Sequence, residues 1–366
     1  MAESRGFTIQ LGPNLTGRVI DVKHVAILAR VCFVTTMQDV AERAGVSSKT
    51  VSRVFNDDPH VTEETRLKVR AAMKELNYVP NMLARTFRAG RASVIGIAVP
   101  DIGDPFFAAI IRAVDQVAQE HGMAIVVTSL GSDASRERQI VEALLRRQVN
   151  GLIVAPIAAD QSYLARWLEH IPVVFIDREP TNLSADSFVE DDRGAARTAT
   201  AHLIERGHER IAFMGDSDHI ITTKLRVAGY RDALDDAGMI PDDGLVALGA
   251  NAHAGEIISG LLRLPSPPTA IFSSNARTSL GVFPALQALG RTDIALVSFG
   301  DFPMASALQP SVTVLDQNPE RLGRAAAERL FVRLDDPDRH LERRTVLAVD
   351  LIQRASSATK QKATKP

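Results

Sequence analysis

The sequence is poor in cysteine and has no long hydrophobic run. Cys32 is the single cysteine among 366 residues, so an internal disulfide and a multi-cysteine zinc site are both excluded. The longest apolar runs, such as 93–100 and 171–176, have the length of a strand. A membrane-spanning helix needs about 20 apolar residues. These absences indicate a protein of a reducing compartment that does not insert into a membrane.

A secretory leader and an excess of either charge are also missing. Residues 25–36 are apolar, but Arg30 interrupts them, Asp21 precedes them, and no small-residue cleavage site follows. We therefore expect a cytoplasmic protein. The formal net charge is −2, so any surface that binds nucleic acid has to be local.

The length and composition are those of a globular protein with two or three domains, with 45% hydrophobic and 23% charged residues. Residues 1–34 show no period, which indicates a disordered extension or a mis-assigned translation start. The tail 356–366 is polar and rich in lysine, and we expect it to be disordered. It has no heptad pattern, so nothing there predicts a coiled coil.

Residues 35–80 read as three short helices. The first has an apolar face and ends at Gly45, a residue that accepts the left-handed backbone of a helix C-terminus. Ser47 or Ser48 begins the second helix, and Thr62 the third. A helix, a tight turn and a second helix form the helix-turn-helix layout. The apolar positions that we assign to the three helices are Met37, Val40, Ala41, Ala44, Val51, Val54, Phe55, Leu67, Val69, Met73 and Leu76.

The second helix of this layout enters the DNA major groove with its first residues. Here these are Ser48, Lys49 and Thr50, with Arg53 one turn later. Lysine and arginine can donate to guanine, and the hydroxyls can serve several bases. Asn56 can contact a phosphate or close the helix. Residues 35–91 hold ten Lys or Arg against seven Asp or Glu, a net +3, but a plain helical bundle with ordinary surface charges would show the same layout.

From residue 93 onward, strand-like and helix-like blocks alternate. This pattern predicts an α/β fold with parallel sheets between helical layers, and about 260 residues of it suggest two similar lobes. Helical blocks are expected at 106–119 and 134–147. The expected strands are 94–99, 124–128, 151–155, 173–176, 210–214, 270–272 and 294–298.

The sequence offers no catalytic or metal-binding motif. We find no Gly-x-x-x-x-Gly-Lys-Ser/Thr loop, no His-Glu-x-x-His and no Gly-x-Ser-x-Gly. His202 and His208 are six residues apart, a spacing that does not place them on one helix face for a metal. We therefore predict no enzyme activity, no metal and no cofactor. A second class, a periplasmic-type solute-binding protein, would need a leader and would lack the helix-turn-helix.

The head sequence resembles the LacI/GalR family of transcription regulators almost position for position. The resemblance rests on 37–56 (MQDVAERAGVSSKTVSRVFN), 61–66 (VTEETR) and 76–81 (LNYVPN), and it continues to about residue 356. It implies a helix-turn-helix head and a two-lobed, periplasmic-binding-protein-like sensing domain. It also implies a repressor that binds palindromic double-stranded operator DNA as a homodimer. A small effector, a sugar or sugar derivative, would tune its DNA affinity.

The resemblance further implies a hinge helix within 81–92. In the family, paired hinge helices enter the minor groove, where a wedge residue bends the DNA. The positions that match are Asn81, Ala84, Arg85 and Phe87, with Phe87 standing where leucine is usual. The alternative is that Phe87 packs onto the core.

Effector-binding positions also follow from the resemblance. They lie after strand ends, where α/β sheets bind ligands, and each has the alternative of a surface salt bridge or a strand cap. The family pattern assigns lobe one to about 93–189 and 316–343, and lobe two to about 190–315 and 344–355. The matching positions are Phe106, Phe107, Asp177, Arg226 and Asn275.

Two departures from the family pattern concern the effector. Ala276 follows Asn275 where the family has aspartate, and Gly300 stands in Ser298-Phe299-Gly300-Asp301 where aspartate is usual. A carboxylate that often touches the effector is thus absent, unless Asp301 replaces it. One hypothesis is that this chain takes a more anionic ligand, such as a sugar acid or phosphate ester.

Overall fold

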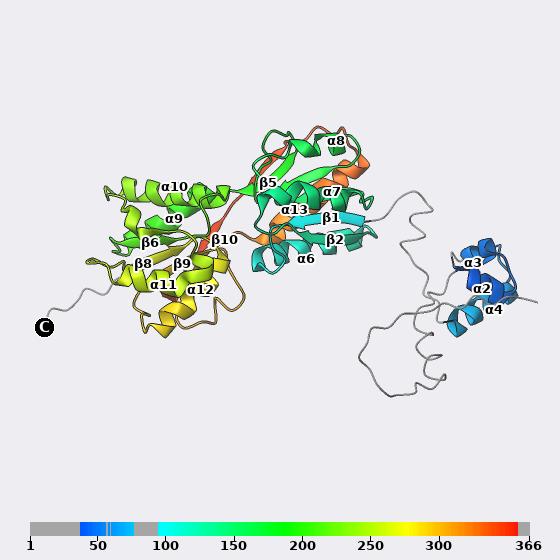
Figure 1. Ribbon diagram of the computed structural model, residues 1–366, viewed down its shortest axis with the longest axis horizontal. Helices are drawn as coiled ribbons and strands as arrows, with labels where there is room; N and C mark the ends of the chain where they lie inside the picture. The colour runs from blue at the N-terminus through cyan, green and yellow to red at the C-terminus, as the bar shows by residue number, and fades with distance from the viewer. Residues whose placement is uncertain (1–36, 56–57, 59, 77–93, 358–366) are drawn as a thin grey trace, which may run out of the picture. The chain divides into compact units, whose positions relative to one another are not determined.

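The computed structural model describes residues 37–55, 58, 60–76 and 94–357 (Figure 1). The chain divides into two compact units, one up to Arg85 and one from Thr86 onward. The predictions for residues 1–34 and for a hinge helix within 81–92 lie outside the described residues.

The described part of the first unit consists of helices α2 (Met37–Ala44), α3 (Ser48–Phe55) and α4 (Glu63–Glu75). Gly45 follows α2 with φ of 65°, a conformation that glycine adopts without strain. The Thr50 amide donates to Ser47 Oγ at 3.1 Å, and Thr62 caps α4 by accepting from the Thr65 amide. These two side chains satisfy amides that a helix start leaves without partners.

One small core holds the three helices together. Its buried members are Val40, Ala41, Val51, Val54, Val69 and Ala72. Among the predicted apolar positions whose side chains the structure describes, Leu67 is the exception, because its side chain is 59% exposed. Two residues of helix turn a side chain by about 200°, so Leu67 points away from the face that carries Val69. The prediction that Leu67 belongs to the core was wrong.

The second unit contains two six-stranded sheets. The sheet of lobe one is parallel throughout, in the order β11-β5-β4-β3-β1-β2. The residues of its central strands are fully buried, and these strands are continuous apolar runs. Both features are expected of a sheet that is covered on both faces. The strands are β1 (Val94–Val99), β2 (Ala124–Ser129), β3 (Gly151–Val154), β4 (Val173–Ile176), β5 (Asp186–Glu190) and β11 (Arg344–Leu347).

Helices cover both faces of this sheet. On one face, α6 (Pro105–Glu120) and α13 (Pro319–Asp335) share an apolar cluster with the strands. On the other face, α7 (Glu137–Leu145) and α8 (Ala165–Leu168) do the same. Each fully buried Leu, Ile, Val or Phe contributes roughly 1.5–3 kcal/mol to folding.

Lobe two repeats this architecture with the strand order β12-β10-β9-β8-β6-β7. β12 is antiparallel to β10, and the other pairs are parallel. Helices α9 (Asp192–Glu205) and α10 (Ile221–Asp236) cover one face, and α11 (Ala250–Leu262) and α12 (Ala276–Ala288) the other. The strands are β6 (Ile211–Met214), β7 (Val246–Ala247), β8 (Ala270–Ser273), β9 (Ala295–Phe299), β10 (Thr313–Asp316) and β12 (Asp350–Ile352).

The chain crosses between the lobes three times. It leaves lobe one after β5, returns from β10 to α13, and passes from β11 to β12. The predicted lobe boundary after residue 343 was wrong, because β11 pairs with β5 in the sheet of lobe one. The third crossing therefore follows Leu347.

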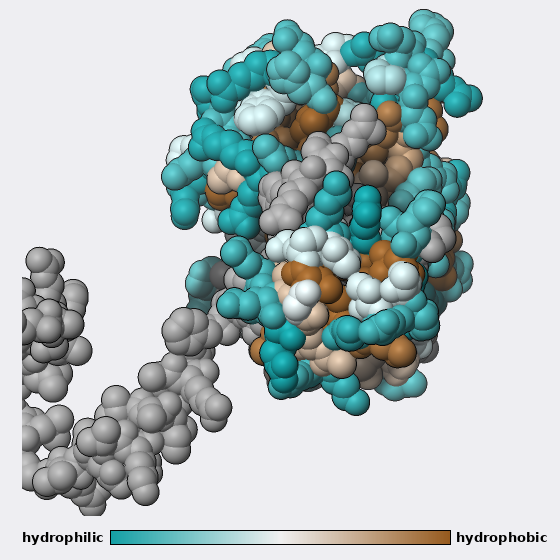
Figure 2. Space-filling model, turned by 90° about the vertical axis from the view of Figure 1, so that its right-hand side faces the viewer, coloured by the Kyte–Doolittle hydropathy of each residue, from teal (hydrophilic) through white to brown (hydrophobic). Residues whose placement is uncertain are grey.

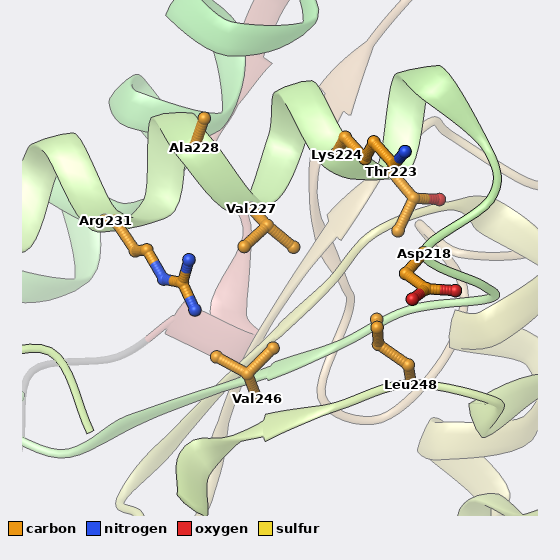
Figure 3. A pocket seen from close by; sticks show the side chains of 8 residues that line it. All are labelled: Asp218, Thr223, Lys224, Val227, Ala228, Arg231, Val246 and Leu248. Atoms are coloured by element: carbon orange, nitrogen blue, oxygen red, sulfur yellow. The ribbon is translucent and has the colours of Figure 1, made fainter. Parts of the chain in front are cut away.

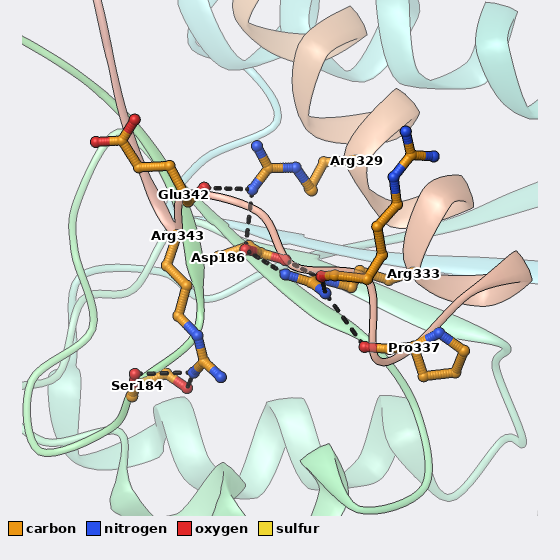
Figure 4. Close-up of polar contacts among 8 residues, drawn as sticks. Ser184, Asp186, Arg329, Arg333, Pro337, Glu342 and Arg343 are labelled. Carbon is orange, nitrogen blue, oxygen red and sulfur yellow. Dashed lines mark hydrogen bonds and ion pairs between the residues drawn. The ribbon is translucent and has the colours of Figure 1, made fainter.

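A buried ionic cluster fastens the returning segment to lobe one (Figure 4). Arg329 and Arg333 of α13 donate to the Asp186 carboxylate at the start of β5, at 2.9 and 2.7 Å. Arg329 also donates to the Glu342 carbonyl. These charge-assisted bonds are stronger than neutral ones, and they tie α13 and the approach to β11 to the same strand.

The described chain extends past the point where we expected a disordered tail. Ser356 and Ser357 are buried. Ser356 Oγ donates to the Leu296 carbonyl and accepts from the Thr313 amide, and Ser357 Oγ lies 2.8 Å from His202 Nε2. The prediction of disorder was wrong for these two serines, because their hydroxyls bind to strands β9 and β10 and to helix α9 of lobe two.

The surface in Figure 2 is mostly hydrophilic, and hydrophobic side chains show through as separate patches. Scattered apolar residues of this kind are usual on protein surfaces. Among the described residues, no helix combines the length and the apolar character that crossing a bilayer requires.

Candidate DNA interface and effector site

Helix α3 presents a polar face opposite its core face. Val51 and Val54 are buried, whereas Ser48 and Lys49 are exposed and the Arg53 side chain is 55% exposed. Lys49 and Arg53 are four residues apart, so they lie on the same side of the helix. The structure thus places Lys49 and Arg53, the two cations of α3 that were predicted to contact DNA, on one accessible face.

Thr50 and Asp58 make contacts that the sequence did not predict, at the start of α3 and with Arg53. Thr50 is half-buried, and its hydroxyl lies 2.9 Å from Ser47 Oγ, so it helps to begin α3. Asp58 lies 3.7 Å from Arg53. Hydrogen bonds from the backbone and ring of His60 lower the Asp58 pKa, so this carboxylate is charged beside the arginine. The other predicted DNA contacts, Asn56, Asn81, Ala84, Arg85 and Phe87, lie outside the described residues.

Arg226 is the most firmly held of the predicted effector residues. It is 5% exposed. Its Nε donates to Asp192 Oδ1 at 2.7 Å, and its Nη1 donates to the Ser274 carbonyl at 2.6 Å. The guanidinium lies 3.7 Å from the centre of the Phe299 ring, a cation–π contact. These contacts join α9, α10, β8 and β9 around one cation.

Asp177 follows β4 and lies on the lobe-one side of the same region. Its φ is 65°, and its amide donates to the Phe188 carbonyl at 3.0 Å. The carboxylate pairs with Arg178 at 3.0 Å, and Arg178 Nη1 donates to the Pro156 carbonyl. A left-handed backbone is costly for a residue other than glycine and is often found at functional sites.

Two buried carboxyls connect Asp177 with Arg226. Burial raises the Asp192 pKa to about 6, although Arg226 lowers it. Burial also raises the Glu190 pKa well above its usual range, and the Asp177 and Asp192 carboxylates raise it further. We call the four residues Asp177, Glu190, Asp192 and Arg226 the lobe junction. Sequence reasoning missed Glu190 and Asp192, although they follow one another closely in the acidic run at 190–192.

Asn275 caps helix α12, a role that the sequence analysis did not predict. Its Oδ1 accepts from the Thr278 amide at 2.7 Å, which begins α12. Its Nδ2 donates to Asp216 Oδ1 at 2.8 Å. Asp216 follows β6 and was not predicted. The structure does not test whether Asn275 also contacts an effector.

The two neighbouring phenylalanines lie in different surroundings. Phe107 is buried in the core of lobe one, whereas Phe106 is half-buried and packs edge-to-face against it at 5.1 Å. Asp104 caps their helix, and burial raises its pKa. Nearby, Arg277 of lobe two pairs with Asp101 of lobe one at 3.0 Å. Phe106 is therefore the better placed of the two to meet a ligand.

Asp301 is engaged elsewhere. Its two oxygens accept from Arg354 Nη1 at 3.1 Å and Nη2 at 2.5 Å. The neighbouring Gly300 has φ of 86°, and a Cβ there would lie 2.9 Å from Gln317 Oε1. The aspartate usual at this position would therefore be strained in this backbone. Nothing in these contacts supports Asp301 as its substitute.

A surface pocket of about 330 Å³ lies elsewhere on lobe two (Figure 3). It lies between α10 and the edge strand β7, and none of the predicted effector residues lines it. Its apolar walls come from Val227, Val246 and Leu248, while Lys224 and Arg231 flank them. Asp177 and Asn275 instead follow the carboxyl ends of β4 and β8, where ligands of α/β sheets bind, and Arg226 donates to the Ser274 carbonyl beside Asn275.

A helix-turn-helix head followed by a two-lobed sensing domain defines a class of DNA-binding regulators. The sequence matches "Bacterial regulatory proteins, lacI family" over residues 36–81 and "Periplasmic binding proteins and sugar binding domain of LacI family" over residues 92–355. The chain belongs to the LacI family. It is a DNA-binding repressor with a sugar-type effector domain and not an enzyme, and the head excludes the solute-binding alternative.

Curated relatives and solved structures agree. The ribose operon repressor of Escherichia coli K12 is 31% identical over 88% of this chain and 99% of its own length. GalR of the same organism is 32% identical over 88% and 96%. The lac repressor dimer bound to operator and the anti-inducer ONPF has a TM-score of 0.72 at 27% identity, covering 89% of this chain and 100% of that one. A CelR–cellobiose complex has a TM-score of 0.63 at 29% identity, covering 88% and 99%.

Proposed function

We propose that the protein acts in the cytoplasm as a homodimer that represses transcription by binding a palindromic operator. The observation that carries this proposal is the exposed pair Lys49 and Arg53 on α3, opposite the buried Val51 and Val54. A single head reads few base pairs, so two heads on a palindrome supply the specificity. The lac repressor dimer, solved on its operator, is the precedent among the relatives.

Lys49→Ala tests the DNA contact. Loss of a direct base contact costs about 1–3 kcal/mol, so we expect operator affinity to fall by roughly five- to 150-fold. The operator is first recovered from genomic fragments with the wild-type protein at moderate salt, and affinity is then measured by fluorescence anisotropy. Lys68→Ala is the matched control, because Lys68 is an exposed lysine of α4 that pairs with Glu64 at 2.8 Å. Equal losses in both variants would contradict a specific role for Lys49.

The second part of the proposal concerns the effector. We infer that it binds beside the lobe junction, with Arg226 and Asp177 as polar anchors and with Phe106 and Asn275 nearby. The two anchors come from different lobes, so a ligand that contacts both favours one lobe arrangement over others. Such a difference in affinity is what shifts a two-state equilibrium, and the lobes in turn set the spacing of the heads.

The charges at the junction do not support the anionic-ligand hypothesis. Arg226 pairs with Asp192, Arg178 with Asp177, Arg277 with Asp101, and Arg354 with Asp301. Each of these cations is already neutralised by a carboxylate. We therefore propose a neutral, hydroxyl-rich effector of the sugar class, for which carboxylates and guanidinium groups serve as acceptors and donors.

A further inference from the structure

Two residues that neighbour Arg226, Glu190 and Ser274, carry buried polar atoms without hydrogen bonds. Within the described chain, the atoms of this kind belong to Trp167, Arg178, Glu190 and Ser274. Glu190 contributes both carboxyl oxygens, and Ser274 contributes its hydroxyl. The Ser274 carbonyl accepts from Arg226, whose Nε holds Asp192. Buried groups without a partner cost about 1–3 kcal/mol each, so each of them requires an explanation.

Glu190 is buried at the point where the chain leaves lobe one, among charged groups that are already paired. It is the last residue of β5, where the chain first leaves lobe one, and it is 4% exposed. The charged groups around it are Asp177 after β4, Asp192 of α9 and Arg226 of α10, while β11 places the apolar Leu347 opposite it. Asp177 is paired with Arg178, and Asp192 with Arg226, so neither ion pair carries a net charge. An additional negative charge on Glu190 would have no counter-ion of its own.

Protonation resolves this imbalance. Burial and the two carboxylates hold the Glu190 pKa well above its usual range, which favours the protonated, neutral form of this carboxyl. A neutral carboxyl has one O–H donor and one carbonyl acceptor. A ligand hydroxyl, which both accepts and donates, satisfies these two groups together.

We propose that the buried, unpartnered Glu190 carboxyl, together with the hydroxyl of Ser274, binds hydroxyl groups of a neutral polyol effector and so determines effector specificity. This inference rests on the effector site proposed above. The lobes open to admit the ligand, and closure brings its hydroxyls to the two groups. An anionic ligand is disfavoured, because it would meet Asp177 and Asp192 without a free cation among the described junction residues.

Four full-length variants test this proposal. Glu190→Gln keeps a donor and an acceptor without a titratable proton, whereas Glu190→Leu removes both. Ser274→Ala removes the second unpartnered group. Ser273→Ala is the matched control, because the Ser273 hydroxyl already has partners in Ser279 and the Asn275 carbonyl. Thermal melting of each variant without ligand shows whether the fold is intact.

Binding is measured by calorimetry with D-ribose, D-galactose, D-glucose, D-ribose 5-phosphate and D-gluconate at pH 6 and pH 8.5. We expect a neutral sugar to bind, and Glu190→Leu to weaken it at least tenfold, while Glu190→Gln and Ser273→Ala stay within a few-fold of wild type. Ser274→Ala should weaken binding several-fold. Wild-type affinity should fall at pH 8.5, and the affinity of Glu190→Gln should not.

The outcomes separate this inference from the proposed function. Equal affinity of Glu190→Leu and wild type would overturn the role of Glu190, while operator binding measured in parallel stays intact. Binding of only the phosphate or the acid, or of no sugar at all, would overturn the neutral-polyol class. A protonated-carboxyl band in the infrared spectrum that is not reduced in Glu190→Gln would show that Glu190 does not hold the proton, because any remaining band then belongs to other buried acids such as Asp192. If the band is from Glu190 but no variant alters sugar binding, a buried water is its partner and the inference fails.

Discussion

At the residue scale, the lobe junction shows how burial decides what a carboxyl can do. Asp186 and Glu190 are the two ends of one strand and are about equally buried. Asp186 meets two arginines, whereas Glu190 meets two carboxylates and a guanidinium already bound to one of them. A buried charge is tolerated when it is paired, and it neutralises when it is not. Asp186 therefore holds α13 against β5, while Glu190 retains a titratable proton.

This difference predicts how stability depends on pH. The folded-state pKa values of Glu190 and Asp192 are raised, so the folded protein binds more protons than the unfolded chain above their ordinary values. The free energy of unfolding then falls as pH rises, for Asp192 between about 4 and about 6 and for Glu190 up to its raised pKa. Glu190→Gln should lose less stability over the same range.

The measurement is urea denaturation of wild type and Glu190→Gln at pH 5, 6, 7 and 8. The free energy of unfolding of Glu190→Gln minus that of wild type should increase by up to about 1.4 kcal/mol per pH unit until Glu190 ionises. Parallel curves for the two proteins would mean that Glu190 titrates normally.

At the element scale, continuous apolar runs made the strands β1, β3 and β4 predictable from sequence. The strands β5, β7, β10, β11 and β12 were missed because they are short or carry charged residues at their ends, as β5 does with Asp186 and Glu190. Whether these segments are strands depends on neighbours distant in the chain, which no local pattern records. The omission of β5 is also why Glu190 was missed, because Glu190 is recognised as the end of a strand only once that strand is known. Arg226 and Asp177 were predicted as effector residues from the family pattern.

The packing of α9 against α10 gives a prediction of its own. A Cβ on Gly229 would lie 2.0 Å from the Arg193 carbonyl oxygen, so the helices would have to separate. Gly229→Ala should destabilise the protein by about 1–3 kcal/mol and weaken effector binding, because Arg226 is one turn away on α10. Chemical denaturation and calorimetry measure the two effects.

Gly260→Ala is the control for this substitution. Gly260 lies within α11, and a Cβ there would meet nothing within 4 Å. Alanine is the better helix former, so stability should rise by about 0.5–1 kcal/mol. A neutral Gly229→Ala variant would show that the two helices approach less closely than the structure indicates.

At the scale of the whole molecule, the ion pair of Asp101 with Arg277 bridges the two lobes while both side chains remain about half exposed. Such pairs contribute about 0–1 kcal/mol. If the effector binds the lobe arrangement that contains this pair, Asp101→Asn should lower effector affinity by less than about fivefold, and the loss should vanish in high salt. Glu320→Gln, which removes an exposed pair with Arg112 inside lobe one, should have no effect. A loss that persists in high salt would contradict an electrostatic origin.

The three crossings also govern the order in which the protein is made. Lobe one receives α13 and β11 only after all of α9 to β10 has been synthesised. While lobe two is emerging from the ribosome, the growing chain holds five strands of lobe one with the apolar face meant for α13 uncovered and with Asp186 still lacking its two arginines. Lobe two can complete most of its sheet first, although it begins later. The lobe that starts first thus finishes late, and a nascent chain halted before residue 319 should expose an apolar surface to chaperones.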